Sequence, residues 1–265
     1  YLGLSAGLDF ETRIMVKDNA PALLARELAA KNWSPQVIAL SGVTDPYQPA
    51  EKKFTLTRQC LEVLCEFQNP VCVVTKNSLI IRDQDLLSRL ARLSAVAVYI
   101  SLTTLDDNLA RVLEPRAPLP GRRLAAIRAL SAAGIPTGVL AAPMIPGLND
   151  EELPALLKAA ADAGSGFAGL AVLRLPHGVK NLFADWLEEN LPNKKDKILN
   201  RVRTLRGGKL NDSRFSVRMK GQGIFADQIA ALFSLGAKKA GLARHAPALS
   251  TAHFLSPHRR QRSLF

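Results

Sequence analysis

The sequence predicts an α/β fold in which parallel strands form a complete or partial barrel with helices on its outside. Short runs rich in Val, Ile or Leu alternate with longer segments of helical spacing. These runs recur at intervals of roughly 25 to 40 residues, as repeated βαβ units do. No Gly-x-Gly-x-x-Gly follows any of them, and no Walker-type loop occurs. The competing fold, an open doubly wound sheet that binds a nucleotide, is therefore less favoured.

Six strands are expected in the first two thirds of the chain. Each candidate is a short, mostly apolar run, as a strand buried on both faces should be. The candidates are residues 12–17, 36–41, 71–76, 96–101, 137–142 and 168–173. A seventh strand is predicted at residues 215–219, followed by a helix at residues 225–235.

The intervening helices are marked by start and stop residues. Asn19 precedes the first helical segment, Asp83 a leucine-rich one, and Asn149 another. Asn and Asp favour the position before a helix, because their side chains accept hydrogen bonds from its first N–H groups. Gly134 and Gly164 follow later segments, where a left-handed residue often ends a helix. We expect residues 1–235 to form the barrel domain and residues 236–265 a basic, flexible tail.

Composition excludes several classes of protein. No apolar run approaches the roughly 18 to 20 residues that span a bilayer, so no membrane partner is expected. The three cysteines, Cys60, Cys65 and Cys72, are too few for a disulfide scaffold and lack metal-ligand spacing. We interpret them as buried thiols in a cytoplasmic protein. The chain begins at Tyr1 without a signal-peptide pattern, which suggests a fragment of a longer protein.

Positive charge is concentrated at the end of the chain. Residues 194–265 carry 16 Lys or Arg and three acids, a net charge of +13, whereas residues 1–193 carry 19 bases and 20 acids. Such asymmetry indicates a polyanionic partner, with nucleic acid the leading candidate, although a basic tail can also serve only solubility. The charge also fits an alternative function, a non-catalytic nucleic-acid-binding α/β protein.

Polar groups follow the predicted strands, at the edge where the carboxyl ends of parallel strands meet. They could hold a zwitterionic, hydroxyl-bearing ligand, with hydroxyls and carboxylates for an ammonium group and Lys or Arg for a carboxylate. Prolines and glycines in these loops also have an ordinary explanation, because turns need them. The candidates are Ser41, Gly42, Thr44, Asp45, Lys76, Ser101, Arg116, Met144, Ile145 and Pro146.

Taken in order, these motifs resemble the radical S-adenosylmethionine (SAM) proteins of the spore photoproduct lyase and DNA-repair-photolyase-like group. The similarity extends from about residue 1 to about residue 235. Its motifs are SGVTDPYQP at 41–49, TK at 75–76, SL at 101–102, EPR at 114–116 and PMIPGLND at 143–150. The resemblance implies a partial (β/α)6 barrel, a 4Fe-4S cluster and SAM as cofactors, and an external electron donor. It also implies a lyase-like enzyme that cleaves SAM reductively, so that a 5′-deoxyadenosyl radical abstracts hydrogen from the substrate.

The resemblance assigns roles to single residues. Ser41, Gly42, Thr44 and Asp45 would meet the methionine amino group of SAM. Lys76 and Ser101 would meet its carboxylate and ribose, with Arg116 as a second carboxylate partner. The turn formed by Met144, Ile145 and Pro146 would cradle the adenine.

Two departures from the group's pattern matter. The Cys-x3-Cys-x2-Cys loop that ligates the cluster is absent, and the resemblance places it upstream of Tyr1. Spore photoproduct lyase also has a hydrogen-donating cysteine near the loop after the second strand, where this chain has none before Cys60. Tyr47 and Tyr99 are the candidates to relay a hydrogen atom instead.

Overall fold

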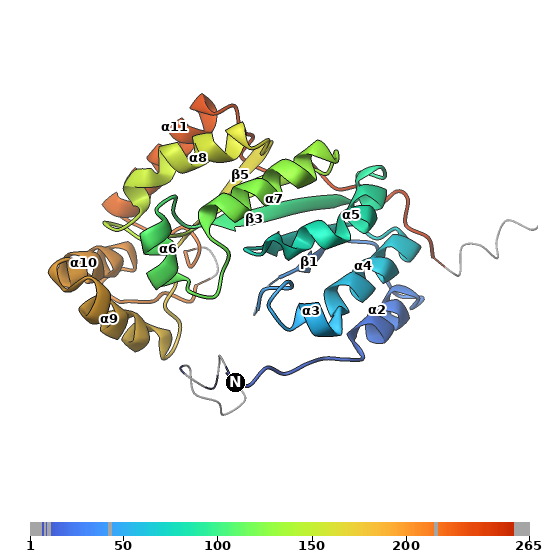
Figure 1. Cartoon of the computed structure of the whole chain (residues 1–265), viewed down its shortest axis with the longest axis horizontal. Helices are drawn as coiled ribbons and strands as arrows, with labels where there is room; N and C mark the ends of the chain where they lie inside the picture. The colour runs from blue at the N-terminus through green and yellow to red at the C-terminus, as the bar shows by residue number, and fades with distance from the viewer. Residues whose placement is uncertain (1–6, 8, 10–11, 42–43, 215–216, 257–265) are drawn as a thin grey trace, which may run out of the picture.

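The computed structural model describes residues 7, 9, 12–41, 44–214 and 217–256 (Figure 1). Within this part, five parallel strands form one sheet in chain order, and the sheet does not close on itself. The strands are β1 (Ile38–Leu40), β2 (Val71–Thr75), β3 (Val96–Leu102), β4 (Thr137–Met144) and β5 (Phe167–Val172). The predicted α/β fold, a partial barrel of parallel strands, is confirmed.

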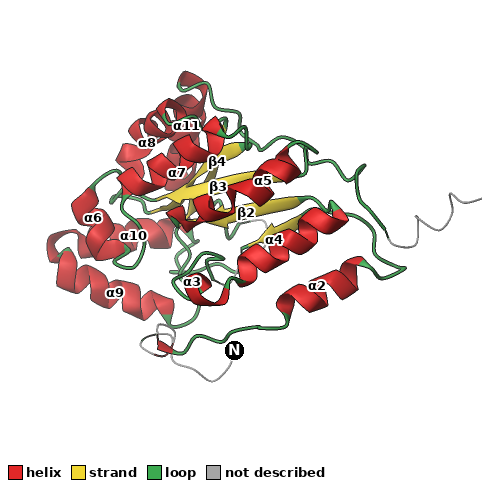
Figure 2. Cartoon of the chain, turned by 45° about the vertical axis from the view of Figure 1, so that its right-hand side comes forward, coloured by secondary structure: helices red, strands yellow, loops and turns green. Residues whose placement is uncertain are grey.

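Helices connect the strands and cover the outside of the sheet (Figure 2). The α-helices are α2 (Ala20–Leu28), α3 (Glu51–Phe54), α4 (Leu56–Phe67), α5 (Gln84–Ala91), α6 (Asp107–Leu113), α7 (Pro120–Ala132), α8 (Leu153–Asp162), α9 (Val179–Asn190), α10 (Lys195–Leu205) and α11 (Ile224–Lys239). Three short 3-10 helices are η1 (Ser78–Asp83), η2 (Asp150–Glu152) and η3 (Pro192–Lys194). No helix in the described ranges is long and apolar enough to cross a membrane.

One face of the sheet, the packed face, forms the main core with the helices. Side chains alternate along a strand, so residues two apart share a face. On β3 this face carries Val96, Val98, Ile100 and Leu102, which are all fully buried. Each such side chain contributes about 1.5 to 3 kcal/mol by leaving water.

The other face, the inner face, is much less filled. It carries Ala39 on β1, Cys72 and Val74 on β2, Tyr99 on β3 and Leu140 on β4, which the parallel register aligns. Ala39 is exposed and the other four are only half-buried. Two glycines also lie on this face: Gly138 on β4 is paired with Tyr99, and Gly169 on β5 is paired with Leu140. The half-buried side chains leave part of the inner face accessible, although Phe167, in register with Gly138 and Tyr99, is buried there.

The segment after α11 crosses the amino end of the inner face. The main-chain N–H of Ala246 donates to the Tyr99 hydroxyl at 3.2 Å, and that of Ser250 donates to the Ser94 carbonyl at 2.8 Å. Farther on, the Leu255 N–H donates to the Phe67 carbonyl at 2.8 Å. The described part of the predicted tail thus lies against the sheet. The domain boundary at residue 235 stays a prediction, although α11 continues through it.

Two predicted strands are wrong within the described residues. Residues 13–17 form no strand, and Ile14, Met15 and Val16 are exposed rather than paired with the sheet. Residues 217–219 form turns, because the N–H of Gly221 bonds back to the carbonyl of Val217. Residues 215–216 of the predicted seventh strand lie outside the described residues.

Candidate functional site

The loop after β1 is fastened to the end of β2 by Asp45. The Asp45 carboxylate accepts hydrogen bonds from the Thr75 hydroxyl at 2.6 Å, the Lys76 N–H at 2.7 Å and the Tyr47 N–H at 2.8 Å. A carboxylate has about four acceptor sites, so at most one remains for a ligand. Asp45 therefore holds the loop in position and has little capacity left to bind an ammonium group.

An ion-pair network lies at the mouth of the inner face, where the carboxyl ends of β2 and β3 meet. Glu114 binds the Lys76 ammonium, and its other oxygen lies 2.6 Å from the Arg123 guanidinium. The Thr103 hydroxyl donates to Glu114 at 3.0 Å. Arg123 also donates to the carbonyl of Ser101 at 3.2 Å. We call Lys76, Thr103, Glu114 and Arg123 the mouth network.

The charges of the mouth network determine the ionisation state of the Glu114 carboxyl group. Burial alone disfavours its charged form, but the nearby charges of Lys76 and Arg123 and their hydrogen bonds outweigh burial and lower its pKa. Glu114 stays ionised, and part of the Lys76 charge is neutralised. A ligand carboxylate that approaches Lys76 would compete with Glu114 for its ammonium group. Lys76 could therefore take its predicted role, binding the ligand carboxylate, only while it also pairs with Glu114.

The remaining polar candidates after β1 and β3 are more available. Ser41 and Thr44 are exposed beside the mouth, whereas Gly42 lies outside the described residues. Ser101 is buried on the inner face next to Leu140, and its hydroxyl makes no hydrogen bond within the described residues. A hydroxyl without a protein partner at the carboxyl end of a strand is suited to bind a ligand.

The turn after β4 is buried. Met144 and Ile145 have no exposed surface, and each packs into one of the two apolar cores. The Asn149 side chain accepts from the Ile145 N–H at 2.7 Å and donates to the carbonyls of Thr103 at 2.7 Å and Pro143 at 3.0 Å. The sequence analysis placed Asn149 before a helix and within the motif at 143–150, without assigning it a contact. Its actual role is to join the ends of β3 and β4.

The two tyrosine candidates lie in different places. Tyr47 is fully buried, and burial together with the charge of Asp83 raises its pKa. Tyr99 lies on the inner face, half-buried, with its ring edge against Phe167 at a centroid distance of 4.9 Å. Burial also raises the pKa of Tyr99. Only Tyr99 is placed on the face that a substrate can reach.

The described residues do not fit an iron-sulfur cluster. No three His, Cys, Asp or Glu side chains gather there as a metal site. Burial raises the pKa of Cys60 and of Cys65 to about 11 and also raises the pKa of Cys72. Cys65 is buried as expected, whereas Cys60 and Cys72 are only half-buried. That these cysteines are not cluster ligands stays a prediction.

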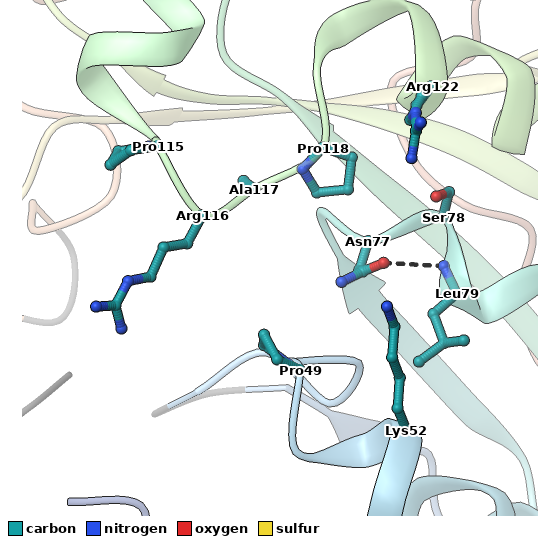
Figure 3. Close-up of a pocket in the computed structure, with 10 residues that line it drawn as sticks. All are labelled: Pro49, Lys52, Asn77, Ser78, Leu79, Pro115, Arg116, Ala117, Pro118 and Arg122. Atoms are coloured by element: carbon teal, nitrogen blue, oxygen red, sulfur yellow. Dashed lines mark hydrogen bonds between the residues drawn. The ribbon is translucent and has the colours of Figure 1, made fainter. Parts of the chain in front are cut away.

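A hollow of about 450 Å³ lies beside the mouth network (Figure 3). Its walls come from α3, the turn between β2 and η1, and the loop between α6 and α7. Arg116 lines it, whereas Asp45 and Ser101 do not. Arg116 follows Glu114 of the mouth network by two residues and lines this hollow.

Comparison with known sequences identifies the family. A model of the Radical SAM superfamily matches residues 11–160. The chain is 35% identical over 207 residues to the uncharacterized protein Rv2578c of Mycobacterium tuberculosis. The aligned segment covers 77% of this chain and 60% of that protein. It is 29% identical over 190 residues to the uncharacterized protein MJ0683 of Methanocaldococcus jannaschii, covering 71% of this chain and 68% of that protein. The chain thus spans about 60% of the length of its mycobacterial relative.

Solved structures share the fold. A mutant spore photoproduct lyase with dinucleoside spore photoproduct matches with a TM-score of 0.59 at 16% identity, over 86% of this chain and 66% of that chain. A second mutant of that enzyme, with bound AdoMet and the same dinucleoside, matches with a TM-score of 0.57 at 16% identity, over 86% and 65%. With the family model covering more than half of its residues, the chain belongs to the Radical SAM superfamily.

Proposed function

We propose that this chain is the SAM-binding barrel of a radical SAM enzyme, with SAM held at the carboxyl ends of the strands against the inner face. The observation that carries the proposal is the Ser101 hydroxyl at the carboxyl end of the inner face, which makes no hydrogen bond to any described residue. Half-buried Cys72, Val74 and Leu140 keep part of this face accessible to a ligand.

The donor chemistry of the mouth fits a sulfonium amino acid joined to adenosine. Lys76 carries positive charge for the carboxylate, and its side chain is 34% exposed despite its bond to Glu114. Ser101 offers a hydroxyl that can both donate and accept a hydrogen bond to ribose. Ser41 and Thr44 lie exposed in the loop that would face the amino group.

Bound SAM would supply a 5′-deoxyadenosyl radical when one electron from an external donor, carried by a 4Fe-4S cluster, cleaves it. The protein's own part is to bind SAM, orient it and exclude water. The segment that bonds to Tyr99 through Ala246 covers the amino end of the inner face and limits solvent there. We infer that Tyr99 is the nearer of the two tyrosines to the reacting groups, and that Tyr47 serves the core.

The cluster ligands do not come from the described residues. We propose that they lie upstream of Tyr1, where the resemblance places the Cys-x3-Cys-x2-Cys loop. No residue named above is assigned to hold iron.

Nucleic acid is the substrate class that we propose. The net charge of +13 over residues 194–265 supports this, because phosphate neutralisation dominates binding to nucleic acids. The matched structures also contain a dinucleoside photoproduct, which is a property of those proteins. The same charge supports a second candidate, a nucleic-acid-binding protein without catalysis.

One experiment separates the two functions. A chain extended upstream of Tyr1 is reconstituted anaerobically with iron and sulfide, and 5′-deoxyadenosine is measured after reductant and SAM are added. We expect release by the wild type and loss of most activity in Ser101→Ala. Asn108→Ala, an exposed change on α6 away from the mouth, is the matched control. Absence of both cluster and 5′-deoxyadenosine, with salt-dependent nucleic-acid binding retained, would leave the non-catalytic function.

A further inference from the structure

The hollow beside the mouth network carries three positive charges and no carboxylate among its lining residues. The charges belong to Lys52 on α3, Arg116 in the loop between α6 and α7, and Arg122 in the first turn of α7. Lys52 precedes Arg116 by 64 residues in the sequence, and the fold brings it to the same hollow as the two arginines. Like charges repel, so an anion between Lys52 and Arg122 would reduce their mutual repulsion.

Two of the cations point into one end of the hollow (Figure 3). The Lys52 amino group extends toward Asn77, and the Arg122 guanidinium extends toward Ser78, while Arg116 extends toward the opposite end. Lys52 and Arg122 are exposed, and neither forms an ion pair with a described residue. The Asn77 oxygen accepts from the Leu79 N–H at 2.9 Å, which leaves its amide N–H groups as donors.

Two neighbouring carboxylates pair with cations other than Lys52 and Arg122. Glu51, beside Lys52 in the chain, lies 2.7 Å from the Arg82 guanidinium. Glu114, just before the loop that carries Arg116, belongs to the mouth network. The hollow is therefore a positive site that presents hydrogen-bond donors.

We propose that this hollow binds a phosphate group carried by a nucleotide-sized molecule. Phosphate oxygens only accept hydrogen bonds, which matches the donors of Lys52, Asn77 and Arg122. A volume of about 450 Å³ lies within the range of about 300 to 1,000 Å³ typical of small-molecule sites. The phosphate can belong to a free nucleotide or to the backbone of a nucleic-acid strand. Asp45 and Ser101 of the proposed SAM site do not line the hollow, whereas Arg116, also a predicted SAM contact, does.

Titration calorimetry on the full chain at low salt, without SAM or reductant, tests this proposal. The probes are inorganic phosphate, adenosine monophosphate and a single-stranded oligonucleotide. We expect the double substitution of Lys52→Gln with Arg122→Gln to weaken phosphate-dependent binding by at least about tenfold. The matched controls are Lys53→Gln on α3 and Arg128→Gln on α7, two exposed cations that do not line the hollow. Both should retain wild-type affinity.

The oligonucleotide distinguishes the sources of the phosphate. If the site binds a nucleic-acid strand, the oligonucleotide binds more weakly to the double variant. The slope of log affinity against log salt concentration then falls by about one phosphate contact for each cation removed. If the site takes a free nucleotide, only binding of the mononucleotide weakens.

Two results would overturn the proposal: no probe loses affinity in the double variant, or the controls lose as much affinity as the double variant does. Lys52→Arg with Arg122→Lys keeps the charges and should retain binding, which separates loss of charge from loss of structure. The assay needs no cluster, so failure of the radical chemistry would leave its result interpretable.

Discussion

The two faces of the sheet are stabilised in different ways. The packed face is held by apolar side chains such as Ile100 and Val98, which have no exposed surface. On the inner face Val74, Tyr99 and Leu140 are only half-buried, and its mouth is held by the charged network around Glu114. Hydrophobic burial can stabilise one face while the other stays open, because one packed face suffices for a core. The open face is then available for a ligand.

Removing the charge of Glu114 should produce one of the two largest effects. Glu114→Gln leaves Arg123, with 1% of its side chain exposed, without its carboxylate partner. Breaking a buried ion pair costs about 3 to 5 kcal/mol, and we expect the lower value because Lys76 lies partly in solvent. Urea unfolding of the wild type and the variant measures this difference.

The contribution of Glu114 to the free energy of unfolding should depend on pH. Its pKa is lowered in the folded protein, so its contribution to stability is complete above the unfolded pKa of about 4.3 and disappears as the pH falls through the folded value. The difference between wild type and Glu114→Gln should therefore shrink below about pH 4.3. A difference that stays constant down to pH 2 would contradict the ion-pair account.

Truncation on the two faces of the sheet should give unequal losses. Ile100→Ala removes a fully buried side chain from the packed face and should cost about 2 to 5 kcal/mol. Leu140→Ala removes a half-buried side chain from the inner face and should cost about 1 kcal/mol. Equal losses in chemical unfolding would show that the inner face is as densely packed as the other.

Two glycines of the inner face should differ in their tolerance of a methyl group. At Gly138 a Cβ would lie 2.1 Å from the Phe167 ring and 2.7 Å from its carbonyl oxygen, so Gly138→Ala should cost about 1 to 3 kcal/mol. At Gly169 the nearest atom is a Leu140 methyl at 3.0 Å, which can shift. Thermal unfolding should show a smaller loss for Gly169→Ala, and the reverse order would refute the predicted crowding at β5.

The smallest effect should come from the hydrogen bond that closes the amino end of the inner face. Tyr99→Phe removes the acceptor of the Ala246 N–H and should cost about 0.5 to 1.5 kcal/mol. Hydrogen exchange of the Ala246 amide should become faster. Unchanged protection of that amide would show that the segment after α11 is held without Tyr99.

Local sequence signals predicted the central strands well. Residues 71–76, 96–101, 137–142 and 168–173 all overlap strands, because continuous runs of β-branched and aliphatic residues are typical of strands in parallel sheets. Residues 12–17 contain a shorter apolar run, Ile14 to Val16, yet all three of these side chains are exposed. Whether an apolar run pairs with a sheet depends on distant partners, which its composition does not reveal.

The site was predicted in part. The strand-end motifs indicated where polar groups gather, and Lys76 and Ser101 do lie at the ends of β2 and β3. Their partners were not predicted, because Lys76 and Glu114 are 38 residues apart and only the folded chain joins them. An uninterrupted apolar run also gives no sign of which face stays open, so the inner face could not be predicted from the strands alone.

A crystal structure of the upstream-extended chain, grown anaerobically with SAM, tests the central claim most directly. We predict SAM at the carboxyl ends of the strands, with the Ser101 hydroxyl within hydrogen-bond distance of the ligand and the adenosine against the inner face. SAM bound on the packed side of the sheet, or at a site that Ser101 does not touch, would contradict this account.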